Sequence, residues 1–497
     1  MRFSIIVGYT FNNNGIGNKG QLPWRLKNDM LYFKKTSSTV IEDENIEYIN
    51  SVIMGMTTWN SIVEGNKPLK NRLNIIITRK TIKSNNKFII YTDWNNLLSA
   101  IIDFNNKKYI INNKILKIQT NFIIGGESIY RLALDKLDIE TIYTTEIYKE
   151  TKCDTFFPNI YELVGNNKFK IRDCSKFESD DNNIHYRFIT YTNIELINKS
   201  FGIWENKKEK MYLDNMKDIL EKGIERDDRT GVGTISKFGI MMKYDLQDTF
   251  PISTTKKMFL RGIFEELMLY LKGYTDNKIL NDKKINIWNG NTSREFLNKR
   301  GLKEYCEGDM GETYGFNFRH FGGEYGGCKA TYPFNYGYDQ LKNVINLIKN
   351  DPTSRRIIIN LWNPKTLHKA ALPSCLCMYQ FYVDTQHKLL NLQIYIRSTD
   401  YFLANNWNTC TGALFVHLIC SLTFIDLKPG ELSVVCGDSH IYKTHVSQVR
   451  ENLKREPYPF PKLIVNNKKD KITSFEWEDL KLIGYRSHSS LSAPMAI

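Results

Sequence analysis

The sequence has no Cys-x-x-Cys pair, and its nine cysteines and eight histidines show no spacing that suits a zinc site. Cys375 and Cys377 are the two cysteines closest to each other. An odd number of unpaired cysteines is typical of a chain whose thiols stay reduced, because disulfide frameworks belong to oxidising compartments. We therefore expect no bound metal and a cytoplasmic, reducing location.

Long hydrophobic runs are also missing. The longest apolar stretch, residues 413–427, contains His417 and Asp426 and is shorter than the roughly 20 residues of a membrane-spanning helix. Residues 1–10 are apolar but lead straight into loop-forming residues without a small-residue cleavage site, so they predict a first strand instead of a signal peptide. We expect a buried helix at 413–427 and no membrane partner.

The positive net charge comes without a nucleic-acid-binding motif. The formal charge is +14, but lysine and arginine are scattered instead of gathering on one periodic face. Runs such as Asn112-Asn113-Lys114 are typical of an AT-rich coding bias. Such a bias together with anionic small substrates is the favoured interpretation. A nucleic-acid-binding module stays open as an alternative that salt-dependent RNA binding would test.

The sequence is long enough for more than one domain, because 497 residues exceed the usual size of a domain with a single hydrophobic core. Residues 1–191 alternate short β-branched runs with helical patterns, which predicts an α/β domain with a largely parallel sheet. The polar residues 192–210 predict a linker, and the longer helices of 211–497 predict an α+β domain. The expected strands are 4–7, 51–54, 73–78, 88–91, 121–124, 140–145, 186–192, 356–361, 378–383 and 389–395, and the expected helices are 29–35, 128–134, 211–221, 261–271, 340–349 and 411–424.

A glycine-rich loop opens the first group of functional motifs. Residues 15–24 combine several glycines with a proline and the aromatic Trp24, and Asp29 then opens a helical pattern that carries Phe33. A carboxylate at a helix start beside apolar side chains can accept paired hydrogen bonds from an amidine-like ring edge. Taken singly, such an aspartate is more often an ordinary charge at a helix N-terminus.

A second motif is a pair of glycines between a strand and a helix. The strand at 122–124 runs into Gly125-Gly126, and a helical pattern begins at Ser128. Bare backbone N–H groups and the positive end of a helix dipole suit a phosphate group. A lone Gly-Gly pair mostly marks a tight turn, so this motif depends on its context.

The order and spacing of these motifs, with segments 52–59 and 68–72 between them, resemble dihydrofolate reductase over essentially residues 1–191. The resemblance implies that Asp29 holds the pterin of dihydrofolate and supports its protonation, with Thr145 hydrogen-bonded to it. It also implies NADPH as the cofactor and a cis peptide between the paired glycines. The remaining implied residues are Trp24, Phe33 and Arg72 for the substrate, and Gly17, Thr58, Gly125, Gly126 and Ser128 for the cofactor.

The chain departs from this family where a basic residue usually stands between positions 55 and 58. Met56 and Thr57 occupy those positions. Thr78, Arg79 and Lys80 follow the next expected strand, and we expect them to hold the 2′-phosphate of NADPH instead.

Cys375 stands on an expected turn just before the strand at 378. A single cysteine is more often buried and inert, unless positive groups stabilise its thiolate. Several arginines are available, and guanidinium groups bind a phosphate monoester through paired hydrogen bonds. Singly, each of them would be interpreted as part of an ordinary ion pair. They are Arg229, the twin Arg355 and Arg356, and Arg397, which is followed by Ser398.

Together these segments resemble thymidylate synthase over about residues 211–497, through motifs at 250–257, 314–322, 437–442 and 495–497. The resemblance implies that the Cys375 thiolate adds to C6 of the uracil of dUMP, so that C5 attacks the methylene carbon of 5,10-methylenetetrahydrofolate. Glu266 would organise the proton transfers, and Asn408 would read the uracil edge.

The same resemblance assigns the remaining ligand contacts and a homodimer. Arg355 and Arg356 would reach the phosphate from the partner subunit, which implies a site shared between two chains. The C-terminus would close over the site. The other implied residues are Arg229, Arg397 and Ser398 for the phosphate, His440 and Tyr442 for the sugar hydroxyl, and Trp288, Asn291 and Asp400 for the folate.

Neighbours of these residues depart from the synthase pattern. Leu376 replaces a histidine after the cysteine, Ile396 replaces a glutamine, and Trp407 replaces the phenylalanine of Pro-Phe-Asn. One alternative is therefore that one domain is catalytically weak and serves mainly as a scaffold. A second is a related enzyme that hydroxymethylates dCMP. The amide of Asn408 favours uracil, because cytosine would call for a carboxylic acid at that position.

Overall fold

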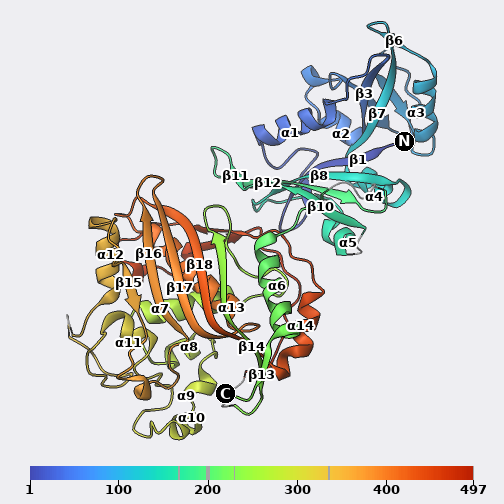
Figure 1. Ribbon diagram of the computed structural model, residues 1–497. Coiled ribbons are helices and arrows are strands. Elements are labelled where there is room, and N and C mark those ends of the chain that lie inside the picture. The colour runs from blue at the N-terminus through green and yellow to red at the C-terminus, as the bar shows by residue number, and fades with distance from the viewer. Residues whose placement is uncertain (85, 166–167, 197–201, 229, 334–335, 496–497) are drawn as a thin grey trace. The chain divides into compact units, whose positions relative to one another are not determined.

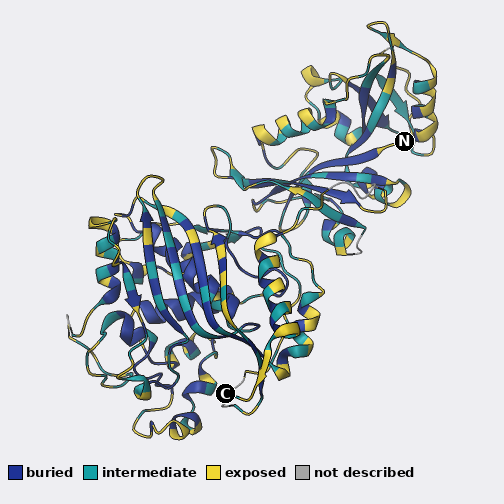
Figure 2. Cartoon of the chain, viewed as in Figure 1, coloured by how far each residue is buried: buried dark blue, intermediate teal, exposed yellow. Residues whose placement is uncertain are grey.

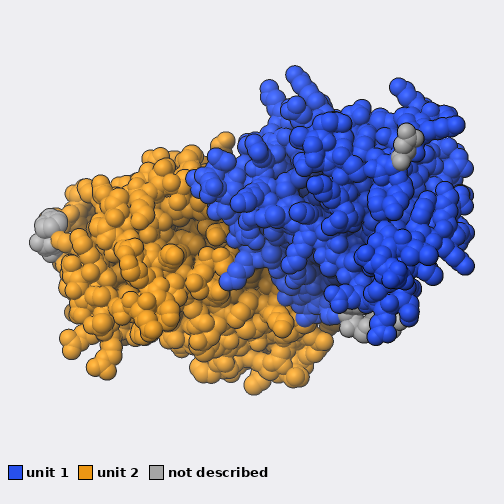
Figure 3. Space-filling view, turned by 90° about the horizontal axis from the view of Figure 1, so that it is seen from above, with its two compact units in different colours: residues 1–205 blue, residues 206–497 orange. Residues whose placement is uncertain are grey.

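The computed structural model describes residues 1–84, 86–165, 168–196, 202–228, 230–333 and 336–495. The chain divides into two compact units, Met1–Glu205 and Asn206–Ile497, which are coloured separately in Figure 3. Within the described ranges, no helix combines the length and the apolar character needed to cross a membrane.

The first unit is built on one sheet with the strand order β10-β12-β8-β1-β7-β3-β4-β5 (Figure 1). The strands from β8 to β5 pair in parallel, while β12 pairs antiparallel with both β8 and β10, so the expected largely parallel sheet is confirmed. Its strands are β1 (Phe3–Thr10), β2 (Gly15–Gly17), β3 (Ile46–Gly55), β4 (Arg72–Ile77), β5 (Ile89–Thr92), β6 (Ile110–Ile111), β7 (Lys114–Gly125), β8 (Ile139–Ile147), β9 (Thr155–Phe156), β10 (Phe169–Cys174), β11 (Glu178–Ser179) and β12 (His185–Asn193), and its helices are α1 (Lys27–Ser38), α2 (Met56–Ser61), α3 (Leu97–Asn106), α4 (Glu127–Lys136) and α5 (Ile160–Gly165).

The sheet of the first unit is covered on both faces, which is why its central strands are continuously apolar. Along β1, Ile5 and Val7 belong to one buried cluster, whereas Ile6 belongs to another. Successive side chains of a strand point to opposite faces, so two clusters on one strand mean two covered faces. Helix α3 was not expected from the sequence.

The second unit contains a sheet with the order β13-β14-β18-β17-β16-β15. The pairing of β17 with β18 is parallel and the other pairings are antiparallel. Its strands are β13 (Ile224–Arg226), β14 (Thr234–Asp245), β15 (Ile358–Asn360), β16 (Leu376–Asp384), β17 (Leu389–Asp400), β18 (Lys428–Tyr442), β19 (Lys462–Val465) and β20 (Leu480–Ile483), and its helices are α6 (Lys207–Lys222), α7 (Leu260–Leu271), α8 (Lys278–Asp282), α9 (Asn289–Thr292), α10 (Arg294–Lys299), α11 (Tyr314–Arg319), α12 (Gln340–Asn350), α13 (Asn405–Cys420) and α14 (Val446–Leu453).

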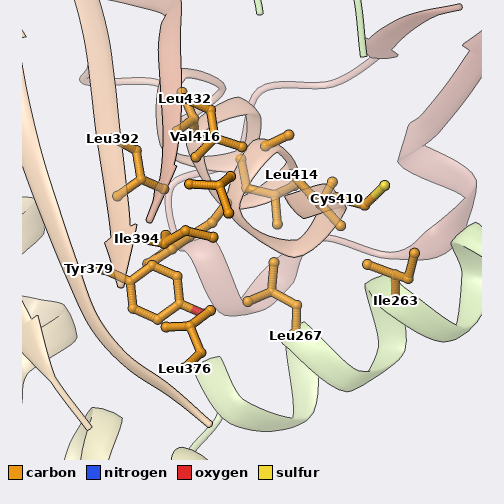
Figure 4. Close-up of a cluster of buried hydrophobic side chains, with 14 of the residues drawn as sticks. Ile263, Leu267, Leu376, Tyr379, Leu392, Ile394, Cys410, Leu414, Val416 and Leu432 are labelled. Atoms are coloured by element: carbon orange, nitrogen blue, oxygen red, sulfur yellow. The ribbon is translucent and has the colours of Figure 1, made fainter. Parts of the chain in front are cut away.

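One face of the second sheet carries the core of this unit. Side chains from α7, α13 and the strands meet there, as Leu267, Leu414 and Ile394 illustrate in Figure 4. The opposite face of the sheet carries exposed positions in this chain (Figure 2). Phe238 on β14 is 82% exposed and Tyr382 on β16 is 67% exposed. An exposed apolar sheet face is typical of a surface that another protein chain covers.

Many expected boundaries differ from the structure; the strand expected at 121–124, for example, belongs to the longer β7 (Lys114–Gly125). The helix expected at 411–424 and the longer one at 413–427 are wrong at their ends, because α13 begins at Asn405 and the chain turns after Cys420. Helix α13 is buried on nearly every side, so no polar stripe marks where it begins or ends. The strand expected at 356–361 spans only Ile358–Asn360.

The segment between the units is shorter than the expected linker at 192–210. Strand β12 continues to Asn193, and helix α6 begins at Lys207 behind its N-cap Asn206, whose side chain accepts a hydrogen bond from the Glu209 N–H. Residues 197–201 of the expected linker lie outside the described residues.

Candidate active sites

The Asp29 carboxylate is the centre of the candidate site in the first unit. It lies in the first turn of α1 and is partly buried. The Thr145 hydroxyl on β8 donates a 2.7 Å hydrogen bond to Oδ1, and the Trp24 indole donates a 3.4 Å one to Oδ2. Burial raises the pKa of Asp29, while these two donors oppose that rise. The carboxyl group is thereby poised to hold a proton closer to neutral pH than an exposed aspartate does.

Gly8 on β1 explains how the carboxylate approaches the sheet so closely. A Cβ at this position would lie 3.3 Å from the Trp24 ring and 3.4 Å from Oδ2 of Asp29. The absence of a side chain therefore leaves room for both groups above the strand. Sequence analysis did not single out Gly8, because nothing near it in the sequence shows what packs on it.

Phe33 and Arg72 lie together on the same side of the unit as α1. The Arg72 guanidinium is 5.5 Å from the centre of the Phe33 ring. It donates 2.8 Å and 3.0 Å hydrogen bonds to the Ser37 hydroxyl and the Lys70 carbonyl, and the residue is only 5% exposed. A cation held this firmly beside an aromatic ring suits a substrate with an aromatic part and a carboxylate.

The paired glycines stand where several parallel strands end. Gly125 ends β7, the Gly125–Gly126 peptide is cis as expected, and Gly126 is the N-cap of α4. A Cβ on either glycine would lie 3.4 Å from the Thr58 hydroxyl of α2, so a side chain there would crowd the space between the paired glycines and α2. Exposed Ser128 lies in the first turn of α4. Bare backbone and a helix N-terminus provide a cradle for a phosphate group.

Thr78 and Arg79 follow β4, which is the neighbour of β3 in the sheet. Gly55 of β3 pairs with Ile77, so these two residues leave the sheet beside the start of α2. Arg79 is exposed, and the Thr78 hydroxyl accepts a 3.1 Å hydrogen bond from the Lys80 N–H. Gly17 lies apart from them, in β2, where it pairs with Thr155.

Cys375 lies immediately before β16 in the second unit and is partly buried. Its backbone N–H donates a 2.8 Å hydrogen bond to the Tyr314 hydroxyl. Nη2 of Arg397 lies 4.0 Å from the sulfur, and the same guanidinium is held by the carbonyls of Pro373 and Ser374. A fixed positive charge at this distance favours a thiolate, which is the nucleophilic form of cysteine.

Glu266 is a buried carboxylate of α7 with three hydrogen-bond donors. Oε1 accepts from the Tyr270 hydroxyl at 2.9 Å and from the Trp288 indole at 2.7 Å, and Oε2 accepts from the Trp407 indole at 2.7 Å. Burial raises the pKa of Glu266, and the three donors oppose the rise. Such a group holds a proton more readily than an exposed glutamate does.

Known proteins match both halves of the chain. The family model of dihydrofolate reductase matches residues 2–193 and that of thymidylate synthase matches residues 210–497. A bifunctional dihydrofolate reductase-thymidylate synthase of Glycine max is 38% identical over 523 residues, which cover 100% of this chain and 95% of the relative. Those of Paramecium tetraurelia and Zea mays are 37% and 36% identical, each over 100% of this chain and over 99% and 97% of the relative.

The chain belongs to the bifunctional dihydrofolate reductase–thymidylate synthase family. It is an enzyme with an oxidoreductase unit followed by a methyltransferase unit, and both units act on folates. We refer to residues 1–205 as the reductase unit and to residues 206–497 as the synthase unit.

The strand register of the synthase unit brings the expected sugar and folate residues together. Ser398 pairs with Asp438 and Asp400 pairs with His440 across β17 and β18. Nδ1 of His440 lies 2.8 Å from Oδ1 of Asp438, and the Tyr442 ring meets the His440 ring edge-on at 5.0 Å. Buried Trp288 is the N-cap of α9, which contains buried Asn291, and partly buried Asn408 lies in the first turn of α13.

The C-terminal segment reaches the same side of the synthase unit. Nε2 of His445 lies 2.7 Å from the Pro494 carbonyl, and its Nδ1 lies 3.5 Å from Oδ2 of Asp400. Ala496 and Ile497, which were expected to close the site, lie outside the described residues, as does Arg229.

Arg355 and Arg356 are not assembled with Cys375 in the way Arg397 is. Both are exposed in the segment before β15. In the described part of the chain, neither guanidinium has a carboxylate within 4.0 Å. Arg355 lines a hollow on the open face of the sheet, together with Gln380, Tyr382 and Gln393.

Two contacts of the reacting groups were missed by sequence reasoning. Tyr314 lay in a recognised motif, but nothing in the sequence linked it to Cys375. Trp407 was noted only as a departure from the family, and its bond to Glu266 spans 141 positions. The signal for Trp407 was the departure itself, since tryptophan adds an N–H donor that phenylalanine lacks.

Proposed function

We propose that the chain catalyses two consecutive reactions. The synthase unit converts dUMP to dTMP with 5,10-methylenetetrahydrofolate, and the reductase unit returns the dihydrofolate product to tetrahydrofolate with NADPH. The membership of both halves in their families carries this proposal, supported by Cys375 beside Arg397 and by Asp29 beside Thr145.

In the synthase unit, Arg397 and Ser398 hold the phosphate of dUMP together with Arg229, and Asn408 reads the uracil edge. The Cys375 thiolate adds to C6 of the ring, and C5 becomes the nucleophile that receives the one-carbon unit. Methylenetetrahydrofolate supplies both the carbon and the reducing equivalents. Glu266 moves the protons, because its carboxyl group is buried and its charge is held by three donors.

In the reductase unit, Asp29 binds the pterin edge of dihydrofolate and favours its protonated form. Thr145 keeps the carboxylate oriented, and Trp24 covers it. Phe33 and Arg72 receive the aromatic part and the glutamate carboxylate of the same substrate. NADPH supplies a hydride when bound.

The cofactor assignment depends on the edge where β3, β4 and β7 end. Gly125, Gly126 and Ser128 suit the diphosphate through bare backbone and the start of α4. Exposed Arg79 suits the 2′-phosphate that distinguishes NADPH from NADH, since Met56 and Thr57 carry no charge there. Gly17 would contact the nicotinamide side.

We further propose a homodimer through the open face of the synthase sheet. That face carries Phe238, Met241 and Tyr382, which are between 50% and 82% exposed. A second copy would bury this apolar surface, and it would place Arg355 and Arg356 near the phosphate site of its neighbour. A cytoplasmic location stays a prediction.

One reaction mixture tests the proposed function. The full chain is incubated with dUMP, methylenetetrahydrofolate and NADPH, and dTMP, tetrahydrofolate and NADPH consumption are measured together. We expect equal amounts of dTMP and oxidised NADPH. Formation of dTMP without NADPH oxidation would mean an inactive reductase unit. In a parallel mixture with dCMP in place of dUMP, a hydroxymethylated product would point to the related pyrimidine-modifying activity.

A further inference from the structure

Three potential metal ligands meet in the synthase unit, outside the groups that bind dUMP. They are the Cys306 and Cys328 sulfurs and a carboxylate oxygen of Asp309, which all lie within 4.8 Å of one another. Cys306 is exposed, Cys328 is partly buried and Asp309 is buried. The two cysteines are separated by 22 positions, so the sequence contains no short Cys-x-x-Cys spacing that would predict the cluster.

The carboxylate of this cluster is held in a fixed orientation. Oδ1 of Asp309 accepts a 2.8 Å hydrogen bond from the Gly311 N–H and a 2.5 Å one from the Tyr325 hydroxyl. Oδ2 accepts a 3.0 Å hydrogen bond from the Cys328 N–H. A ligand whose position is set by such bonds needs little reordering when a cation arrives, and hydrogen-bonded ligating carboxylates are usual in metal sites.

The separation of the two sulfurs suits a shared cation. They lie 3.4 Å apart, well beyond the roughly 2.05 Å of a disulfide bond. Two thiolates in a tetrahedral zinc site, each about 2.3 Å from the metal, lie about 3.8 Å apart. A shift of a few tenths of an ångström in exposed Cys306 would provide that geometry.

The electrostatics of the cluster also favour a cation. Asp309 is buried beside the two sulfurs, so ionising both thiols would gather three negative charges in a small space. A divalent ion reverses this balance, because it binds the thiolates and displaces their protons. The neighbouring Lys329 is paired with Asp276.

We propose that Cys306, Asp309 and Cys328 form a binding site for one zinc ion, with a fourth position open to water. Two thiolates and one carboxylate form a ligand set that binds zinc in preference to magnesium or calcium. A bound ion would stabilise the loop from Cys306 to Asp309. The next residue, Met310, accepts a 3.0 Å hydrogen bond through its carbonyl from the Ala371 N–H, four positions before Cys375.

The test uses Co²⁺ as a spectroscopic probe on the full, reduced and metal-stripped chain. We expect about one equivalent to bind with a thiolate-to-cobalt charge-transfer band. The band should disappear in Cys306→Ser and in Cys328→Ser. Glu307→Gln removes an exposed neighbouring carboxylate and Cys153→Ser removes a partly buried thiol elsewhere, and both should keep the band.

Two measurements on the wild-type chain do not depend on any variant folding. Native mass spectrometry should show one zinc ion for each chain, and zinc should raise the melting temperature of the synthase unit by several degrees. The proposal is overturned if the reduced chain binds no Co²⁺ saturably, or if the Cys306→Ser, Cys328→Ser double variant binds it equally. It is also overturned if the two thiols only form a disulfide under mild oxidants and the reduced chain takes up no metal.

Discussion

The Trp407 indole N–H donates a 2.7 Å hydrogen bond to Oε2 of Glu266, the carboxylate proposed to move protons in the synthase. Gly262 makes this arrangement possible, because a Cβ there would lie 2.9 Å from the Trp407 ring. Trp288 and Tyr270 already serve Oε1, so Trp407 is the donor that fixes the second oxygen. The departure from Pro-Phe-Asn therefore adds a charge-stabilising contact instead of merely changing the packing.

Trp407→Phe should move the synthase pH profile upward. Burial raises the pKa of Glu266, and the Trp407 N–H opposes that rise because it stabilises the ionised form. Removing the donor raises the pKa further, so the limb of the kcat profile that reports Glu266 moves to higher pH whichever form is active. We expect kcat at neutral pH to fall about tenfold, as the loss of ~1.4 kcal/mol from one charged hydrogen bond implies.

The control for this variant is Trp477→Phe. The ring centre of Trp477 lies 6.0 Å from that of Phe264, which belongs to α7 like Glu266. The three hydrogen-bond donors of Glu266 do not include Trp477. Its pH profile should match that of the wild-type enzyme. An unchanged profile in Trp407→Phe as well would show that the indole bond has no part in the proton transfers.

Asp29→Asn should fold but lose reductase activity by at least about a hundredfold. An amide keeps the shape of the side chain but cannot carry the negative charge that favours the protonated pterin. NADPH oxidation with dihydrofolate measures the loss, and the synthase activity of the same preparation is the internal control. Reductase turnover within about threefold of wild type, roughly 0.7 kcal/mol of barrier, would reject the role of Asp29.

Arg79→Ala should raise the Michaelis constant for NADPH more than that for NADH. Only NADPH carries the 2′-phosphate, and exposed Arg79 is the charged group next to Thr78 at the end of β4. Steady-state kinetics with both cofactors give the comparison, and Lys87→Ala serves as an exposed-lysine control. Equal effects on the two cofactors would place the guanidinium away from the 2′-phosphate.

Mixing Cys375→Ala with Arg356→Ala should restore synthase activity if the site is shared. After random subunit exchange, half of the dimers are mixed, and each mixed dimer has one site with neither defect. About one quarter of wild-type activity should therefore return. This requires that Arg356→Ala alone be strongly impaired.

A second pair of variants makes this mixing experiment decisive. Cys375→Ala and Glu266→Gln alter residues of one chain, so both sites of their mixed dimer stay defective and no activity should return. If subunit exchange between Cys375→Ala and Arg356→Ala is verified and this mixture also shows no synthase activity, then Arg356 acts within its own chain.

The sequence by itself determined the family, the order of the two units and most elements with a clear period. Asp29 and Cys375 were proposed because the order and spacing of the motifs around them resemble two enzyme families, whereas neither residue taken singly indicated a function. Strands such as β1 and β4 were recognised because residues buried on both faces form continuous apolar runs. Strands β14 and β18 were not expected, since their burial follows no simple alternation.

Only the tertiary structure decided which distant groups meet. Thr145 reaches Asp29 across 116 positions, Trp407 reaches Glu266 across 141, and Cys306 meets Cys328 across 22. Local patterns report the period of a helix or strand, because that period depends on neighbouring residues. Long-range pairs depend on how whole elements pack, and the positioning of Glu266 and the cysteine cluster follow from that packing.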